Sequence, residues 1–183
     1  MNDTTPTAPA GGDTTTPPIS DSTDLFAALA SEQRILLDTV NRCSDAQLER
    51  KGVVGAWSIK NTLAHLTGWE ALVVETLPDR LATGQRPASF DAFDADQDGW
   101  NARQVTEHED TSPKEQIFEL ENTRIQLVNY LRSLGDETLA KSHPWPGWDG
   151  TLAEYILASV CEHEKEHCDA ICASMAAMGP DAD

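Results

Sequence analysis

The sequence is poor in positive charge, with 13 Lys and Arg against 31 Asp and Glu in 183 residues, a formal net charge of −18. Such a surface repels the phosphate backbone, so we expect no nucleic-acid partner. The sequence also lacks a window of about 18 uncharged apolar residues, which a membrane-spanning helix would need. The first residues, MNDTTPTAPAGG, contain neither a basic nor an apolar segment. We therefore expect no membrane partner and a cytoplasmic location.

Cysteine is scarce, and its spacing argues against disulfides. Cys161, Cys168 and Cys172 fall within one expected helix, where seven residues span about 10 Å. That separation exceeds the reach of a disulfide, and side chains four residues apart on a helix run nearly parallel. We expect all four cysteines of the chain to be reduced thiols.

No segment alternates between apolar and polar residues, so no β-strand is expected, whereas four segments carry apolar residues at helical spacing. They cover residues 23–43, 58–77, 113–134 and 151–178. Pro78 is expected to end or kink the second helix, and Gly135 to cap the third. A shorter helix is expected within residues 98–110. The sequence thus predicts an all-α protein, a four-helix bundle with long connections and short extra helical segments.

The two ends of the chain differ from this pattern. Residues 1–21 are rich in Thr and Pro and offer almost no apolar surface, so we expect a disordered tail. Residues 22–178 form the expected bundle, a single domain of ordinary size. Residues 179–183 are expected to be a short acidic C-terminal tail.

A histidine pair in the last helix predicts a metal site. His163 and His167, in CEHEKEHC, lie about 40° apart on the helix, on the apolar stripe that faces the bundle interior. Two inward imidazoles one turn apart can converge on one ion. For a single histidine, core packing would be the better interpretation, but the pair favours a metal.

The letters HEKEH also match the H-E-x-x-H pattern of zinc peptidases, in which the glutamate is the general base. The metzincin continuation is absent after His167, and the same letters also match the inverted motif. We therefore interpret Glu164 and Glu166 as solvent-side flanks of the stripe and disfavour a peptidase.

The third ligand is expected from the second helix. His65 shares a face with Thr62, Trp69 and Leu72, so its ring also points inward. A metal ion held by three neutral imidazoles, with its other coordination positions open to water or a substrate, is typical of a catalytic site. Cys161, Cys168 and Cys172 are expected on the opposite face and are poor candidate ligands.

The stretch Asp94–Gly99, DADQDG, opens like an EF-hand calcium loop. The twelfth position should be a bidentate glutamate and is Val105, so the main ligand is missing. We interpret the stretch as the acidic start of a helix.

Two blocks of the chain, GVVGAWSIKNTLAHLTGWE and EHEKEH, resemble the DinB-like superfamily of four-helix bundles. The similarity spans about residues 22–176. Within the superfamily it is strongest to the ClbS/DfsB branch and to the N-terminal domain of mycothiol-dependent maleylpyruvate isomerase. The resemblance implies an up-down-down-up bundle and a divalent metal, often zinc or nickel, on His65, His163 and His167. Members of the family commonly have a tyrosine where this chain has Glu164.

The resemblance also implies a function. Known members include thiol-dependent transferases and isomerases, while relatives of the colibactin self-resistance protein act on a reactive genotoxin. Our leading hypothesis is a metal-dependent enzyme that conjugates or rearranges a small electrophile, with a low-molecular-weight thiol as a possible second cofactor. The alternative is a non-catalytic protein that sequesters a small toxin. A homodimer is a further possibility for either.

Three tryptophans are candidates for the lining of a substrate pocket at the metal site. Trp57, Trp69 and Trp100 carry large apolar surfaces near the expected histidine cluster, and Glu164 is expected to border it. Core packing is the alternative, and we expect it for at least two of the three.

Overall fold

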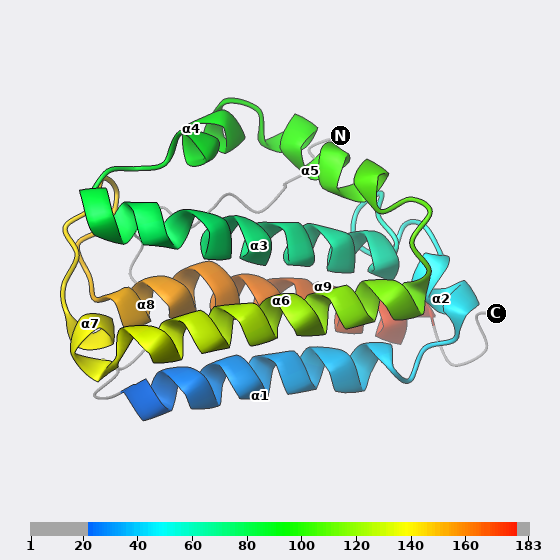
Figure 1. The fold of residues 1–183 in the computed structure, drawn as a ribbon. Helices are drawn as coiled ribbons and strands as arrows, with labels where there is room; N and C mark the ends of the chain where they lie inside the picture. Colours follow the sequence, from blue (N-terminus) through cyan, green and yellow to red (C-terminus); the bar gives the residue numbers. More distant parts are fainter. Residues whose placement is uncertain (1–21, 179–183) are drawn as a thin grey trace.

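Four long helices lie side by side in the computed structural model, which describes residues 22–178 (Figure 1). They are α1 (Ser22–Val40), α3 (Ile59–Thr83), α6 (Pro113–Leu134) and a last helix in three continuous parts, α8 (Leu152–Ile156), the π-helical η1 (Leu157–Glu162) and α9 (His163–Met178). The last helix and α1 run in one direction, and α3 and α6 run in the other (Figure 1). The predicted all-α, up-down-down-up bundle is confirmed. The tails predicted at 1–21 and 179–183 lie outside the described residues.

Shorter helices occupy the connections: α2 (Asp45–Glu49), α4 (Ala88–Ala95), α5 (Gln97–Glu107) and α7 (Asp136–Ala140). Because α3 and α6 run in the same direction, the chain must return along the bundle between them. It does so through α4 and α5, which pass along the outside of α3 (Figure 1). No helix within residues 22–178 is both long and apolar enough to cross a membrane.

Side-chain caps fix where the long helices begin. The Ser58 hydroxyl accepts a hydrogen bond from the Asn61 backbone N–H at 3.1 Å at the start of α3. Ser112 and Glu115 form a capping box before α6, which ends at Gly135 as predicted. Such caps satisfy backbone N–H groups that the helix itself leaves without partners.

Pro78 does not end α3, which continues to Thr83 and is capped by Gly84 in the left-handed conformation, with φ of 69°. Pro78 lies on the exposed side of the helix, whereas its neighbours Leu77 and Arg80 are buried. Packing of those residues outweighs the helix-breaking cost of about 3 kcal/mol that a proline carries. Of the two outcomes predicted at Pro78, an end or a kink, the end of the helix does not occur.

The acidic stretch before α5 starts that helix, as predicted. Asp96 is the N-cap, and its side chain accepts a hydrogen bond from the Gly99 backbone N–H at 2.9 Å. Asp94 forms an ion pair with Arg86 at 2.7 Å. These two carboxylates serve different protein partners rather than one calcium loop.

The bundle interior contains two apolar clusters separated by a polar layer. One cluster includes Leu29, Trp69, Leu127 and Cys161, and the other includes Leu36, Leu66, Leu120 and Cys168. Five polar residues of α3, α6 and α9 are buried beside these apolar positions: His65, Glu70, Arg124, Glu164 and His167. We use the term polar layer for these five residues together with His163.

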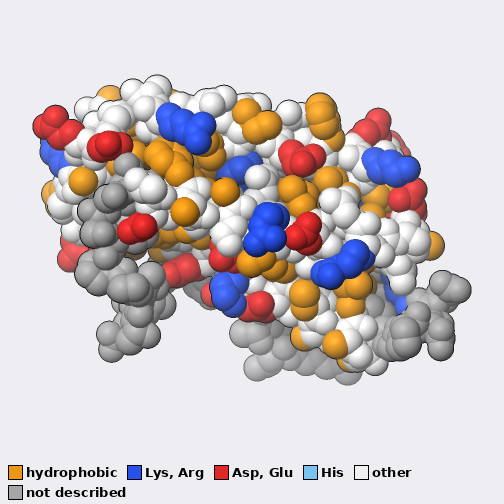
Figure 2. Space-filling view, turned by 90° about the horizontal axis from the view of Figure 1, so that it is seen from below, with side chains coloured by type: hydrophobic (Ala, Val, Ile, Leu, Met, Phe, Trp, Pro, Cys, Tyr) orange, Lys and Arg blue, Asp and Glu red, His pale blue; other side chains and the backbone are white. Residues whose placement is uncertain are grey.

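On the face formed by α1, apolar side chains lie among acidic and basic ones (Figure 2). Within residues 22–178, the large apolar side chains that are exposed are Ile35, Phe118 and Ile125. Ile125 has an exposed fraction of 56 %, so it lies outside the core.

Candidate metal centre

The structure brings together the three histidines that the sequence singled out. His65 comes from α3, and His163 and His167 come from successive turns of α9. The Nε2 atom of His163 lies 3.1 Å from that of His65 and 3.2 Å from that of His167. Each ring offers one candidate ligand atom, and these atoms all lie within 4.8 Å of one another.

This arrangement fits a divalent metal. Around a tetrahedral zinc ion with Zn–N bonds of about 2.0–2.1 Å, neighbouring ligand nitrogens are about 3.3–3.4 Å apart. The two observed Nε2 separations, 3.1 and 3.2 Å, are close to that value. When all three rings carry their proton on Nδ1, three Nε2 lone pairs face one another in a largely buried space, where a cation can accept them. The residues present are therefore those that a metal would require.

Burial keeps the three imidazoles in the form that binds metal. It lowers the pKa of His65 to about 3, with a further lowering by His167, and lowers the pKa of His167 to about 4. The pKa of His163 is also lowered well below its ordinary value, by burial and by the two other rings. All three rings are neutral near pH 7, as metal ligands must be.

Asn101, on α5, is a candidate hydrogen-bond acceptor for the His65 ring. A neutral histidine that binds metal through Nε2 carries its proton on Nδ1 and needs an acceptor there. The Nδ1 atom of His65 and the Oδ1 atom of Asn101 are both buried, and neither has a hydrogen-bond partner among the described residues. Asn101 raises the pKa of His65 against the larger lowering by burial. The two groups complement each other, and sequence analysis missed Asn101.

The three candidate tryptophans all lie around the histidines. The ring centroid of Trp57 is 5.2 Å from that of His65, and the centroid of Trp100 is 6.1 Å from it. Trp69 lies 5.5 Å from His163, and its indole N–H donates to the Ser159 carbonyl oxygen. Trp69 is also buried within an apolar cluster, so it belongs to the core as well as to the wall of the site.

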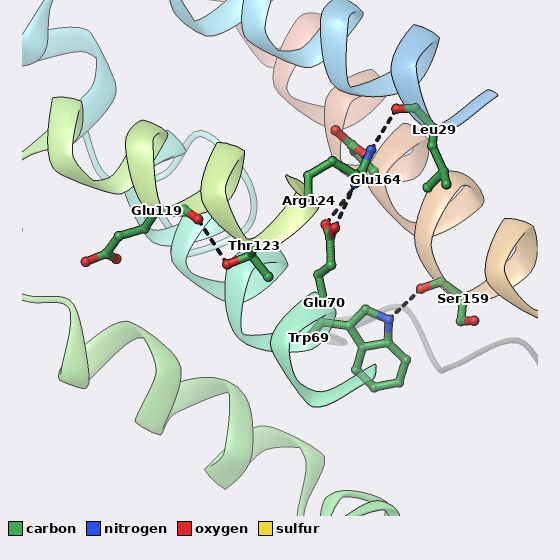
Figure 3. Close-up of polar contacts among 8 residues, drawn as sticks. All are labelled: Leu29, Trp69, Glu70, Glu119, Thr123, Arg124, Ser159 and Glu164. Carbon is green, nitrogen blue, oxygen red and sulfur yellow. Dashed lines mark hydrogen bonds and ion pairs between the residues drawn. The ribbon is translucent and has the colours of Figure 1, made fainter. Parts of the chain in front are cut away.

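Glu164 lies in the bundle interior, and the prediction that it flanks the stripe on the solvent side is wrong. Its side chain is buried and accepts a hydrogen bond from Arg124 of α6 (Figure 3). The Arg124 guanidinium also donates two hydrogen bonds to Glu70 of α3, at 2.7 and 3.1 Å, and one to the Leu29 carbonyl oxygen of α1. This buried network joins all four long helices.

The network also has electrostatic consequences for its members. Burial raises the pKa of Glu70 and of Glu164, and Arg124 partly offsets that shift in both. Burial alone would lower the pKa of Arg124, but the two carboxylates reverse this and raise it. Since Glu164 is held by Arg124, it is not placed as the general base of a zinc peptidase, which would face the metal-bound water.

The cysteines play no part in the cluster. All four are free thiols, in agreement with the prediction. Cys161 and Cys168 lie in the apolar clusters, and burial raises the pKa of Cys161 to about 12.

A signal for the Arg124 network was present in the sequence. Arg124 continues the buried stripe of α6 between Leu120 and Leu127, and Glu70 does the same in α3. A charged residue on an apolar stripe needs a buried partner of opposite charge. Asn101 carried no comparable signal, because α5 has no long apolar stripe.

Fold and site together define an all-α bundle protein with a three-histidine centre built from its second and fourth long helices. The chain belongs to the DinB superfamily, whose family model matches residues 28–171. No curated protein sequence matches the chain.

Two solved structures share the fold. One is the colibactin self-resistance protein ClbS in complex with a dsDNA, with a TM-score of 0.68 and 16 % sequence identity over 86 % of this chain and 96 % of that one. The other is an uncharacterised protein of Escherichia coli UTI89, with a TM-score of 0.67 and 16 % identity over 85 % of this chain and 92 % of that one. At this identity the likeness concerns the fold.

Proposed function

We propose that the protein is a metal-dependent enzyme that adds a low-molecular-weight thiol to a small electrophile, or rearranges the electrophile through such an addition, in protection against stress or toxins. The observation that carries the proposal is the convergence of three neutral imidazole Nε2 atoms from α3 and α9. Imidazole ligands suit zinc and nickel among the divalent ions. Membership of the DinB superfamily supports the same assignment.

The proposed reaction is an addition across an activated double bond. The thiol sulfur forms a bond to one carbon, and the electron pair of the double bond takes up the thiol proton at the other carbon. Rotation about the resulting single bond, followed by loss of the same thiol, returns the thiol and leaves the isomer. When bound, the metal would lower the pKa of a thiol or of water beside it.

The chain's own residues would supply the surroundings for this step. His65, His163 and His167 would hold the ion, with Asn101 fixing the orientation of the His65 ring. Trp57 and Trp100 lie against His65 and would exclude water from one side of the site. A dry site strengthens the interaction between a metal and a developing negative charge.

A second candidate function is sequestration without catalysis. It is favoured by a pocket of about 390 Å³ with aromatic walls that adjoins Trp69, a size suited to a small molecule. The similarity of fold to ClbS, a self-resistance protein, is compatible with it. A sequestering protein would saturate at one equivalent of ligand, whereas an enzyme would turn over many.

The test uses full-length protein purified without an affinity tag. We expect close to one equivalent of zinc or nickel by plasma mass spectrometry, and thiol-dependent consumption of electrophiles in a screen that pairs several thiols with activated alkenes. His65→Ala should lose both the metal and the activity. His108→Ala is the matched control, because His108 pairs with Glu119 outside the cluster.

Stoichiometric metal in His65→Ala would contradict the proposed centre, since His65 would then not be a ligand. Metal-loaded protein that binds electrophiles in a one-to-one ratio without turnover would contradict the enzyme and favour sequestration.

A further inference from the structure

The pocket beside Trp69 is separate from the histidine cluster. Its lining residues come from α3, α4, the turn around Gly147 and the start of the last helix, and they do not include His65, His163 or His167. Trp69 belongs to both places, because its ring contacts His163 and also lines the pocket. Five of its lining residues are aromatic: Trp69, Phe90, Phe93, Trp148 and Tyr155. Such a wall suits a flat, apolar ligand.

One wall of the pocket carries a buried arginine that no carboxylate neutralises. Arg80 of α3 is only 5 % exposed. Within residues 22–178, every ion pair of the structure involves other cations. The Nε atom of Arg80 is buried and has no hydrogen-bond partner among the described residues. An arginine remains charged under all ordinary conditions, so this positive charge is buried without an ion-pair partner in residues 22–178.

Aromatic rings surround the Arg80 guanidinium and account for part of its stability. Its central carbon lies 4.3 Å from the centroid of the Trp145 ring, 4.6 Å from that of Tyr155 and 5.8 Å from that of Phe90. Cation–π contacts of this kind are attractive, and the Tyr155 side chain also raises the pKa of Arg80 against the lowering by burial. These contacts hold the guanidinium in place, while its Nε–H group is left without an acceptor among the described residues.

A second arginine on the wall shows the contrast. Arg86 forms ion pairs with Asp94 at 2.7 Å and with Asp91 at 3.6 Å, so local carboxylates neutralise it. Although the formal net charge of the chain is −18, Arg80 in this pocket has no ion-pair partner within the described residues.

We propose that this pocket binds an organic monoanion, with a carboxylate on the Arg80 guanidinium and an apolar, unsaturated body against the aromatic wall. The planar fork of arginine matches a carboxylate. Along α3, Trp69 and Arg80 are about 16 Å apart at 1.5 Å per residue, so an elongated ligand would direct its other end toward Trp69 and the histidines. The identification of this ligand as the substrate rests on the proposed function. The binding of a carboxylate in the pocket is independent of that function.

The test compares two probes that share one apolar body, 4-phenylbutyrate and 4-phenylbutan-1-ol. Both are titrated into the full-length protein by isothermal calorimetry at constant ionic strength. We expect one site per chain and a carboxylate affinity roughly 10- to 100-fold above that of the alcohol, as for hydrogen bonds to a charged group. Equal affinities for the two probes would overturn the proposal.

Variants assign the preference to Arg80. Arg80→Gln should bring the carboxylate down to the affinity of the alcohol and leave the alcohol unchanged. Arg132→Gln is the control, because Arg132 also lies over an aromatic ring, that of Phe26, but outside the pocket. A carboxylate preference that survives in Arg80→Gln would contradict the assignment. Should Arg80→Gln not fold, Ala158→Phe would fill the pocket with Arg80 in place, and unchanged carboxylate binding would then overturn the proposal.

The same titrations after metal removal separate this proposal from the proposed function. Carboxylate binding that persists in metal-free protein, in a preparation that shows no turnover even when loaded with metal, supports the pocket and contradicts the enzyme. Turnover of neutral and anionic electrophiles at equal rates, with no Arg80-dependent binding, supports the enzyme and contradicts the pocket's ligand class.

Discussion

At the scale of single residues, we expect the centre to depend on a hydrogen bond that fixes one imidazole. The buried Nδ1 atom of His65 and the buried Oδ1 atom of Asn101 are each without a hydrogen-bond partner among the described residues. A Nδ1–H donor facing that oxygen would set both the tautomer and the orientation of the ring. Asn101 is thus a positioning residue rather than a ligand.

We expect Asn101→Ala to lower the zinc affinity by about 10- to 100-fold, the usual effect of losing a partner of a ligating histidine. The affinity is measured by competition with a chelating dye at pH 7. Asn129→Ala, an exposed asparagine on α6, is the control and should bind zinc like the wild type. Equal affinities of the two variants would show that Asn101 does not act through His65.

At the scale of helices, α9 is buried on a wider face than its sequence indicated. It packs against both α1 and α3. His163 and His167 face His65 of α3, whereas Glu164 reaches Arg124. A single apolar stripe predicts only one buried side, which is why Glu164 was assigned to solvent. The π-helical segment η1 lies directly before His163, and such segments often occur at functional sites.

The Arg124 network links four helices, so its removal should destabilise the whole bundle. We expect Arg124→Met to lower the free energy of unfolding by about 3–5 kcal/mol, because two carboxylates would remain buried without a partner. Urea unfolding followed by circular dichroism at pH 7 measures the change.

Arg34→Met provides the comparison for this prediction. Arg34 pairs with Asp38 at 3.4 Å on the surface, where both side chains are largely exposed. Loss of such a pair should cost less than about 1 kcal/mol. Similar losses in the two variants would mean that the buried network contributes no more than a surface ion pair.

At the scale of the whole molecule, a bound metal would join parts of the chain that are far apart in sequence. His65 and His163 are separated by 98 positions, and their contact connects α3 to α9. A ligand that binds only the folded state stabilises it by about 2.7 kcal/mol at 100 times its dissociation constant. Metal binding and the stability of the bundle are therefore coupled.

Zinc at 100 times its dissociation constant should raise the Tm of metal-free protein by about 5–10 °C, since 1 kcal/mol shifts Tm by about 2–4 °C in a domain of this size. Differential scanning calorimetry measures the shift, which EDTA should reverse. His65→Ala should show little or no shift. A shift of the same size in that variant would place the stabilising ion elsewhere.

The overall charge bears on the comparison with ClbS. That protein was solved with a dsDNA, whereas this chain has a formal net charge of −18. Affinity for DNA depends mainly on the neutralisation of phosphates by Lys and Arg. The absence of a nucleic-acid partner stays a prediction, and the shared fold does not alter it.

The sequence alone determined the features that depend on local order along the chain. Helical spacing and the lack of strand patterns predicted the bundle, because each rests on residues within a few positions of one another. The same spacing placed His65, His163 and His167 on inward faces. The family resemblance supported the same trio.

Only the tertiary structure decided which distant residues meet. Neighbouring helices decide that α3 continues past Pro78 and that Glu164 is buried against Arg124. They also place Asn101 near His65. The uncompensated charge of Arg80 depends on which carboxylates come near it, and that is fixed by packing across the bundle. Periodicity along a helix defines a face, but the partner of that face is set by the three-dimensional arrangement of the other helices.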